Sequence, residues 1–319
     1  MKRFLSRVLP LLLSFGLIFN CTGCSTVLVL AGKARENSEA SSSVISESSA
    51  SSGVISTPVP TEDGDLRAFY TDVANAESVT VMVYMIGSDL ESEDGSATDD
   101  LLEMADAALS ENVHLVLQTG GTETWWNDVC TDDESERFVI ENGDMTLLQS
   151  LGSMNMTDAD TLSDFIRFSA ESYPADRYEL ILWDHGGGTM TGFGYDELYE
   201  DTSLTLSSLS TALYNGGVQF DFIGFDACLM ATAEVAYALD PYADYLIASE
   251  ESEPGEGWAY KNWLTMLAED PAVPTAELGK KLADDFLEAY IFADMPTLSV
   301  LDLRYVPELY AALESYWES

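Results

Sequence analysis

Residues 79–86 of this 319-residue chain read Val-Thr-Val-Met-Val-Tyr-Met-Ile, an almost wholly apolar run. A strand of this composition is expected to be buried on both faces, which is typical of a parallel sheet covered by helices on each side. Downstream, short apolar runs alternate with amphipathic stretches, and this order predicts an α/β fold. The further strands that we expect are residues 113–118, 178–183, 220–225, 245–248 and 298–301.

Amphipathic stretches between these strands predict the helices that cover the sheet. They are residues 97–109, 158–172, 204–214, 229–239, 261–267 and 275–290. Two apolar runs on either side of Glu-Asn-Gly143 predict a β-hairpin, inserted within the segment 124–150. No repeat or further change of composition divides residues 66–319, so we expect one domain with a mostly parallel central sheet, helices on both faces and the inserted hairpin. The domain can extend beyond Ser319, because an amphipathic pattern is still running at 307–317.

The first 23 residues have the pattern of a signal peptide. Three positive side chains, Lys2, Arg3 and Arg7, precede an apolar run at residues 8–19 that is too short to span a bilayer and contains Pro10. We therefore expect this segment to direct export of the protein and to be removed.

Small residues directly precede Cys24 in the sequence Thr-Gly-Cys-Ser, which resembles the lipobox of bacterial lipoproteins. The resemblance implies cleavage after residue 23 and lipidation of Cys24, and so a membrane anchor. The alternative is an uncleaved membrane helix that continues through residues 27–31, although the polar residues 20–26 would then lie within the membrane.

Residues 24–65 are predicted to form a flexible tether, because ten of the 21 residues from Asn37 to Thr57 are Ser. Such a tether would hold the domain away from a membrane. We expect the protein in the cell envelope, lipid-anchored and facing outside the cytoplasm.

The chain is strongly acidic, with 56 Asp and Glu against 13 Lys and Arg and a net charge of −43. Eight of the basic residues follow Arg35, too few for the basic patch that nucleic-acid binding requires. Since 46% of the residues are apolar, the chain is expected to fold despite its charge. The negative charge opposes docking of the protein on anionic lipid surfaces. We expect a monomer.

Two strands end in residues that can do chemistry. The strand at 178–183 runs into Asp-His185-Gly-Gly-Gly, and the strand at 220–225 runs into Asp-Ala-Cys228-Leu-Met. Ligands bind at the carboxyl ends of strands in open α/β sheets, so we expect both side chains at one edge of the sheet.

His185 could act as a base toward the Cys228 thiol and as an acid toward a leaving amine. We expect Cys228 at the start of the helix at 229–239, where the helix N-terminus would stabilise a thiolate. The glycines after His185 let backbone N–H groups approach a carbonyl oxygen. The alternative readings are a packing cysteine and a simple glycine turn. The pairing favours catalysis, because the other histidine, His114, lies within a strand and is interpreted as structural.

Cysteine usage does not indicate a disulfide scaffold. Once Cys21 leaves with the signal peptide and Cys24 is acylated, Cys130 and Cys228 remain as thiols. The two could pair, but the motif around Cys228 favours a free thiol, and Cys130 has no chemistry that we can assign.

The motifs around His185 and Cys228 resemble those of clostripain-family cysteine peptidases. The resemblance extends to the opening strand and to the later segment Ser249-Glu-Glu-Ser-Glu-Pro-Gly-Glu-Gly-Trp258. That family belongs to the superfamily of caspases, legumains and gingipains. The resemblance implies a caspase-like fold and a cysteine endopeptidase that acts on proteins or peptides. It further implies His185 as general acid/base, Cys228 as nucleophile, and the backbone N–H groups of Gly186 and Cys228 as the oxyanion hole.

The enzyme that gives the family its name prefers Arg or Lys before the scissile bond. The resemblance implies that Asp226, two residues ahead of Cys228, lines the pocket for that side chain, with Glu256 as a second candidate. The alternative role of Asp226 is to cap a helix that begins near Ala227. Some members are activated by a cut after a basic residue between the His and the Cys. Residues 186–227 contain no Lys or Arg, so we expect activity in one uncut chain.

The sequence itself requires no cofactor. The resemblance implies that calcium dependence can occur, and Asp94, Asp99 and Asp100 could supply oxygen ligands. Since the spacing is not that of an EF-hand, a solvated acidic loop is the reading that the sequence favours. The family's first loop is rich in amides, whereas this chain has Gly-Ser-Asp89-Leu, so the role of the loop is not predicted.

The sequence leaves two other classes of function as alternatives. One is a non-catalytic surface lipoprotein that uses the caspase-like fold as a binding module, which the intact Cys228 and His185 oppose. The other is a metallohydrolase, for which an H-E-x-x-H helix is lacking.

Overall fold

The computed structural model describes residues 71–199, 202–290 and 296–318. The predicted signal peptide, the lipidation residue Cys24 and the tether at 24–65 lie outside these ranges. Among the helices that the structure describes, none has both the length and the apolar character needed to cross a membrane.

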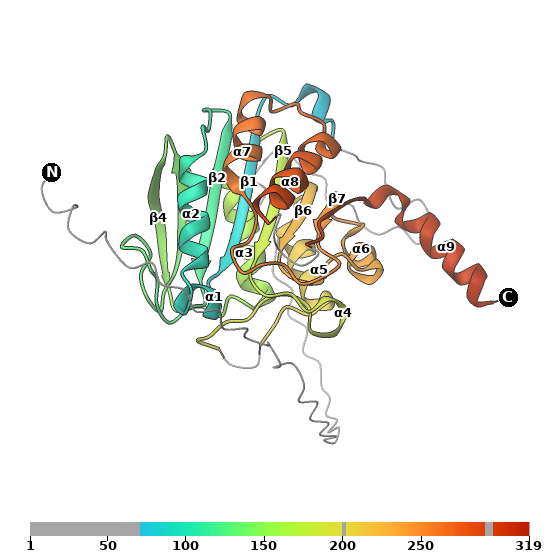
Figure 1. Ribbon diagram of the computed structural model, residues 1–319, viewed down its shortest axis with the longest axis horizontal. Coiled ribbons are helices and arrows are strands. Elements are labelled where there is room, and N and C mark those ends of the chain that lie inside the picture. Colours follow the sequence, from blue (N-terminus) through green and yellow to red (C-terminus); the bar gives the residue numbers. More distant parts are fainter. Residues whose placement is uncertain (1–70, 200–201, 291–295, 319) are drawn as a thin grey trace, which may run out of the picture. The chain divides into compact units, whose positions relative to one another are not determined.

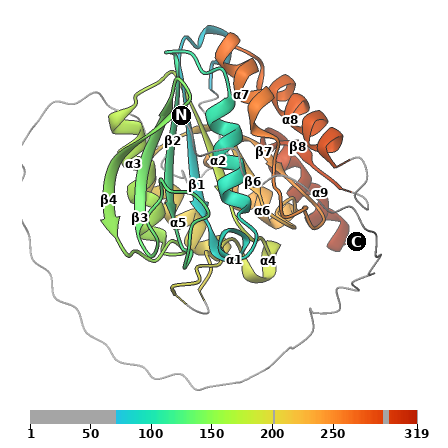
Figure 2. The same ribbon diagram turned by 60° about the vertical axis from the view of Figure 1, so that its left-hand side comes forward.

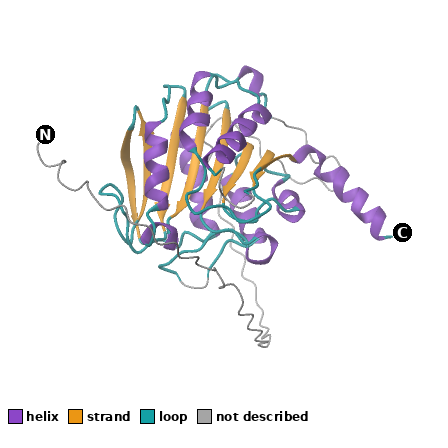
Figure 3. Cartoon of the chain, viewed as in Figure 1, coloured by secondary structure: helices purple, strands orange, loops and turns teal. Residues whose placement is uncertain are grey.

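A central eight-stranded sheet has the order β4-β3-β2-β1-β5-β6-β7-β8 (Figure 1, Figure 3). The strands are β1 (Val79–Ile86), β2 (Val113–Gly120), β3 (Ser135–Glu141), β4 (Asp144–Gly152), β5 (Arg177–Trp183), β6 (Phe220–Asp226), β7 (Ala243–Ala248) and β8 (Ser299–Asp302). Strands β2, β1, β5, β6 and β7 run parallel. The hairpin β3–β4 and the edge strand β8 pair antiparallel to them. The mostly parallel sheet with an inserted hairpin is therefore confirmed.

Helices pack on both faces of the sheet (Figure 2). One face is covered by α3 (Ala159–Ser172), α5 (Leu206–Gly216) and α6 (Ala233–Leu239), and the other by α2 (Ser96–Asp106), α7 (Tyr260–Glu269) and α8 (Thr275–Ala289). The remaining helices are α1 (Ser88–Ser92), α4 (Gly188–Thr191) and α9 (Val306–Trp317), with short 3-10 turns η1 (Val73–Asn75) and η2 (Leu303–Tyr305).

Strand β1 shows why the apolar run decides the fold. All of its residues are buried. Met82 and Tyr84 pack with the core beneath α3 and α5, whereas Val81 and Val83 pack with the core beneath α2 and α7. Alternate side chains of a strand point to opposite faces, so a strand covered on both sides must be apolar throughout.

The expected helix at 229–239 is shorter than predicted, because α6 begins at Ala233. The Thr232 side chain caps it by accepting a hydrogen bond from the Val235 N–H at 3.2 Å. Leu229 has a left-handed φ of 65°, and its N–H donates to the carbonyl of Glu251. Cys228 therefore lies in a loop, and the prediction that a helix N-terminus stabilises its thiolate is wrong.

Candidate active site

A pocket of ≈ 260 Å³ lies at the carboxyl ends of β5 and β6. It brings together the two residues that sequence analysis placed at one edge, His185 and Cys228. Its walls come from the ends of both strands, from α1 and from the loop after β7. The lining residues are Leu90, Trp183, Asp184, His185, Asp226, Ala227, Cys228, Glu253, Pro254, Gly255 and Gly257.

The imidazole of His185 is hydrogen-bonded to a carboxylate that sequence analysis did not assign. Its Nε2 lies 2.7 Å from Oδ1 of Asp89 in α1. The turn before Asp89 is held by two backbone bonds, from the N–H of Gly87 to Gly120 and from that of Ser88 to Gly121. Ser88 is buried with a φ of 49°, a left-handed conformation that a non-glycine residue adopts at a cost. The loop after β1 therefore positions a partner for the histidine.

Cys228 is a half-buried free thiol. Its Sγ accepts a hydrogen bond from the Glu253 N–H at 3.2 Å. The other described thiol, Cys130, is buried, and burial raises its pKa to about 12. Cys130 is therefore protonated at neutral pH, which leaves Cys228 as the candidate nucleophile.

The backbones of Gly186 and Cys228 approach each other closely. A Cβ at Gly186 would lie 2.1 Å from the Cys228 carbonyl oxygen, so a side chain there would require the backbone to move. The bridge that Gly186 forms with Phe193 uses the N–H groups of Gly187 and Gly194. The N–H of Gly186 is thus not used by that bridge.

Asp226 is the last residue of β6 and is 4% exposed. Its Oδ2 accepts hydrogen bonds from the Trp258 N–H at 2.9 Å and from the Tyr260 hydroxyl at 2.8 Å. Because α6 begins only at Ala233, the helix-cap role of Asp226 is wrong. Burial raises the pKa of its carboxyl to about 7, since a desolvated carboxylate is disfavoured.

The structure places Glu256 on the exposed surface, outside the residues that line the pocket. Glu253 lines it instead. Both Glu253 carboxylate oxygens are buried, and their polar neighbours are the side chains of Asp226 and Trp258. Burial, and after it the neighbouring Asp226, raise the pKa of this carboxyl well above its ordinary value.

A third carboxylate, Asp100 of α2, lies next to Asp226. It is 2% exposed and accepts a hydrogen bond from the Trp183 indole N–H at 2.6 Å. A Cβ at Gly257 would lie 2.7 Å from Asp100 Oδ2 and 3.0 Å from Asp226 Oδ2. Gly257, with a φ of 67°, therefore lets the loop close over both acids.

Asp94 and Asp99, the other suggested calcium ligands, are exposed, unlike Asp100. Within residues 71–199, 202–290 and 296–318, no group of three or more His, Cys, Asp and Glu has the arrangement of a metal site.

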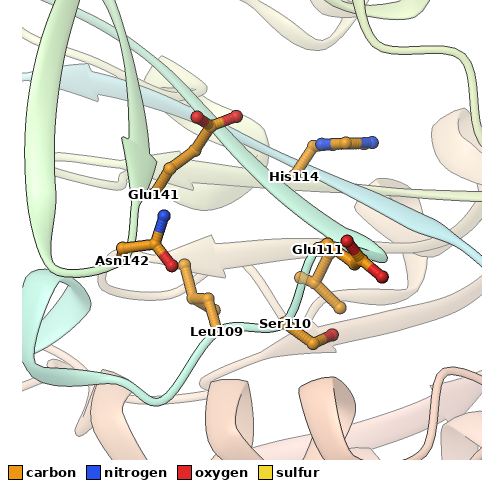
Figure 4. Close-up of a pocket in the computed structure, with 7 residues that line it drawn as sticks. Leu109, Ser110, Glu111, His114, Glu141 and Asn142 are labelled. Atoms are coloured by element: carbon orange, nitrogen blue, oxygen red, sulfur yellow. The ribbon is translucent and has the colours of Figure 1, made fainter.

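A second pocket, of ≈ 170 Å³, lies near the start of β2 and contains the other histidine, His114 (Figure 4). Glu111 and Glu141 also line it. The His114 ring packs against Tyr173 with centroids 5.4 Å apart. His114 belongs to the amino end of β2, whereas His185 follows the carboxyl end of β5. The two histidines therefore lie at opposite ends of the parallel strands.

A family model for the clostripain family matches residues 83–318. The chain belongs to this family of cysteine peptidases. Clostripain of Hathewaya histolytica is 35% identical in an alignment of 123 residues that covers 33% of this chain and 23% of clostripain. The chain thus matches less than a quarter of that relative's length.

Two solved structures from this group of proteases share the fold. A secreted C11 cysteine protease from Bacteroides thetaiotaomicron, in complex with an irreversible peptide inhibitor, has a TM-score of 0.61 and 23% identity, covering 74% of this chain and 68% of that one. An inactive zymogen C11 protease from Parabacteroides distasonis has a TM-score of 0.58 and 26% identity, covering 74% and 65%. The expected caspase-like fold is confirmed by these similarities.

Sequence analysis assigned no role to Asp89 or Glu253. It suggested Asp100 as a calcium ligand rather than as an acid beside the pocket. Asp89 lies three residues after the end of β1, at the same edge of the sheet as His185, and this position could have pointed to it. Glu253 and Glu256 stand in one loop, and nothing in their spacing tells which of them is buried.

Proposed function

We propose that this protein is a membrane-anchored, extracytoplasmic cysteine endopeptidase that cleaves after Arg or Lys. The observation that carries the proposal is one pocket lined by His185, Cys228 and the buried carboxylate of Asp226. Membership of the clostripain family supports protein or peptide substrates.

In the proposed mechanism, His185 accepts the proton of the Cys228 thiol, and the resulting thiolate attacks the scissile carbonyl carbon. The N–H groups of Gly186 and Cys228 stabilise the oxyanion. His185 then gives its proton to the leaving amine, and a water molecule hydrolyses the acyl-enzyme with His185 as base. Since Nε2 is bonded to Asp89, Nδ1 is the nitrogen that exchanges this proton with sulfur.

The preference for Arg or Lys is proposed from the acids of the pocket. A cationic side chain would form a charge-assisted hydrogen bond with Asp226. A neutral side chain would leave the buried Asp226 carboxylate without a counter-charge, which is unfavourable. The residues that line the pocket include no Lys or Arg that could neutralise it internally.

The test compares Cys228→Ala and His185→Ala with the matched controls Cys130→Ser and His114→Ala. We expect the first two to lose at least about 100-fold in kcat/KM on a peptide with Arg before the scissile bond, and the controls to retain activity. A peptidyl electrophile ending in Arg should label Cys228, as seen by mass spectrometry. A folded wild-type protein that neither hydrolyses nor becomes labelled would be the non-catalytic binding module instead.

The anchor is proposed from the sequence around Cys24. Mass spectrometry of the native protein should show an acylated N-terminal Cys24, whereas an unmodified Met1 would favour the membrane-helix alternative.

The active protein should also run as one band on a denaturing gel, because residues 186–227 contain no Lys or Arg at which it could cut itself.

Calcium is proposed as an effector from the resemblance to the family. Titration of Ca²⁺ into protein treated with a chelator, followed by hydrolysis, tests it. Activity that returns only with Ca²⁺ would show that a cofactor is required.

A further inference from the structure

Three large apolar side chains are exposed on the loops that carry His185 and Cys228. Met190 in α4 is 91% exposed, and Tyr195 and Leu229 are each 38% exposed. None of the three belongs to the residues that line the pocket beside the nucleophile. The proposed mechanism gives none of them a role.

The backbone of Leu229 has a conformation that is unfavourable for its residue type. Its φ of 65° is left-handed, which is costly for a residue with a bulky side chain. Among the described non-glycine residues, the others with such a φ are the polar Ser88, Asp133 and Asn142. Glycine would adopt this φ without strain, and the Leu229 side chain is not buried in the core in return. Strain held next to a nucleophile points to a function for the side chain.

Backbone contacts hold Leu229 between two loops. Its N–H donates to the Glu251 carbonyl at 3.0 Å, and a Cβ at Gly188 would lie 2.8 Å from the Leu229 carbonyl oxygen. Gly188 is the first residue of α4, so the helix that carries Met190 adjoins the residue directly after Cys228. Met190 and Leu229 therefore belong to neighbouring loops beside the nucleophile.

The chemistry of the leaving group decides which part of a substrate meets these side chains. In the proposed mechanism the leaving amine takes its proton from His185, so the residue that carries the amine must lie beside the imidazole. The Tyr195 ring lies beside it too, with the two ring centroids 6.3 Å apart. Met190 stands in the short hairpin that follows His185 and is closed by the bridge between Gly186 and Phe193. The side chain before the scissile bond enters the pocket instead.

We propose that Leu229, Met190 and Tyr195 form a subsite for the first residue after the scissile bond, and that this subsite prefers an apolar side chain. The inference rests on the peptidase function proposed above. Contact of an apolar substrate side chain with these three removes apolar surface from water, which is favourable. An acidic side chain would be repelled, because Asp and Glu greatly outnumber Lys and Arg in this chain.

The experiment uses the full chain and three peptides that have Arg before the scissile bond and differ only in having Leu, Ser or Asp after it. It measures kcat/KM, because this quantity includes the step in which the leaving amine departs. The wild-type protein should favour Leu over Ser by about tenfold, which is the lower end of the discrimination that apolar contacts provide.

Two variants of Leu229 separate its side chain from its backbone strain. Leu229→Ala removes the side chain alone, whereas Leu229→Gly removes the strain as well. In both, the ratio of Leu to Ser should fall to about threefold or less, and the ratio of Ser to Asp should stay, because the charge of the protein is unchanged. Leu102→Ala, the matched control from an exposed position of α2, should keep both wild-type ratios.

A wild-type protein that does not favour Leu over Ser would overturn the inference, as would an unchanged ratio in folded Leu229→Ala and Leu229→Gly. Equal losses on all three peptides with a lower unfolding temperature would overturn it too, because Leu229 would then serve the fold alone. If neither variant folds, Met190→Ala decides, since truncation of a side chain that is 91% exposed has little effect on stability. Its ratio of Leu to Ser should fall by at least about twofold, and an unchanged ratio overturns the inference.

Failure of the proposed function looks different. A folded wild-type protein would then cleave none of the three peptides, and the inference would fall with the function. A protein that cleaves all three at the same rate would keep the function and lose the subsite.

Discussion

At the scale of single residues, the pair of His185 and Asp89 decides how the imidazole is oriented. The two side chains are 43% and 45% exposed, and an ion pair at that exposure contributes little to stability. A hydrogen bond that holds one ring nitrogen does, however, direct the other toward its task. We therefore expect Asp89 to matter for turnover rather than for folding.

Asp89→Ala should lower kcat by about tenfold or more with little change in KM, because the ring loses its orientation. Asp89→Asn retains an oxygen that accepts from Nε2 and should recover most of the loss. Steady-state kinetics on an Arg peptide check this, with thermal unfolding as the control for folding. Wild-type kcat in Asp89→Ala would show that the contact is only a surface pair.

At the scale of elements, the site depends on two loops that leave adjacent parallel strands. The loop after β5 brings Gly186 against the loop after β6, so closely that the space for a Cβ is occupied by the Cys228 carbonyl oxygen. The loop after β6 is in turn held by backbone bonds from Leu229 and Ala231 to the segment that follows β7. Changes in one loop should therefore displace the nucleophile.

Gly186→Ala tests this dependence. A Cβ 2.1 Å from the Cys228 carbonyl oxygen must push the two loops apart, and a displacement of about 1 Å can cost about 100-fold in rate. We expect kcat/KM to fall by about that factor, while the unfolding temperature changes by only a few degrees. If Gly186→Ala has wild-type kinetics, the loops are not held together as described.

At the scale of the whole domain, buried acids at neutral pH oppose the folded state. Burial raises the pKa of Glu179 to about 8 and the pKa values of Asp184 and Asp226 to about 7. In the unfolded chain these carboxyls have pKa values of about 4. Between these limits the folded protein binds more protons than the unfolded one, so stability falls as the pH rises.

The unfolding temperature should therefore be higher at pH 5 than at pH 8. We expect a difference of at least about 4 °C, which corresponds to about 1–2 kcal/mol in the free energy of unfolding of a domain of this size. Differential scanning calorimetry at fixed ionic strength measures it. Glu179→Gln should make the unfolding temperature less dependent on pH near pH 8. An unfolding temperature that rises from pH 5 to pH 8 would contradict the account of buried, protonated acids.

The sequence by itself determined the sheet, the inserted hairpin and the meeting of His185 with Cys228. The reason is that the spacing of apolar residues along a strand or helix indicates whether one or both of its faces are buried. In addition, the carboxyl ends of parallel strands lie at one edge of the sheet. The motifs around His185 and Cys228 also resemble those of the family to which the chain belongs.

Only the tertiary structure decided which acid of the loop after β7 is buried. The loop turns at Pro254, whose carbonyl accepts from the Gly257 N–H, and this turn leaves Glu253 inside and Glu256 outside. The start of α6 at Ala233 and the contact of Asp89 with His185 were decided in the same way. Each depends on contacts between segments far apart in the chain, which local period and spacing do not encode.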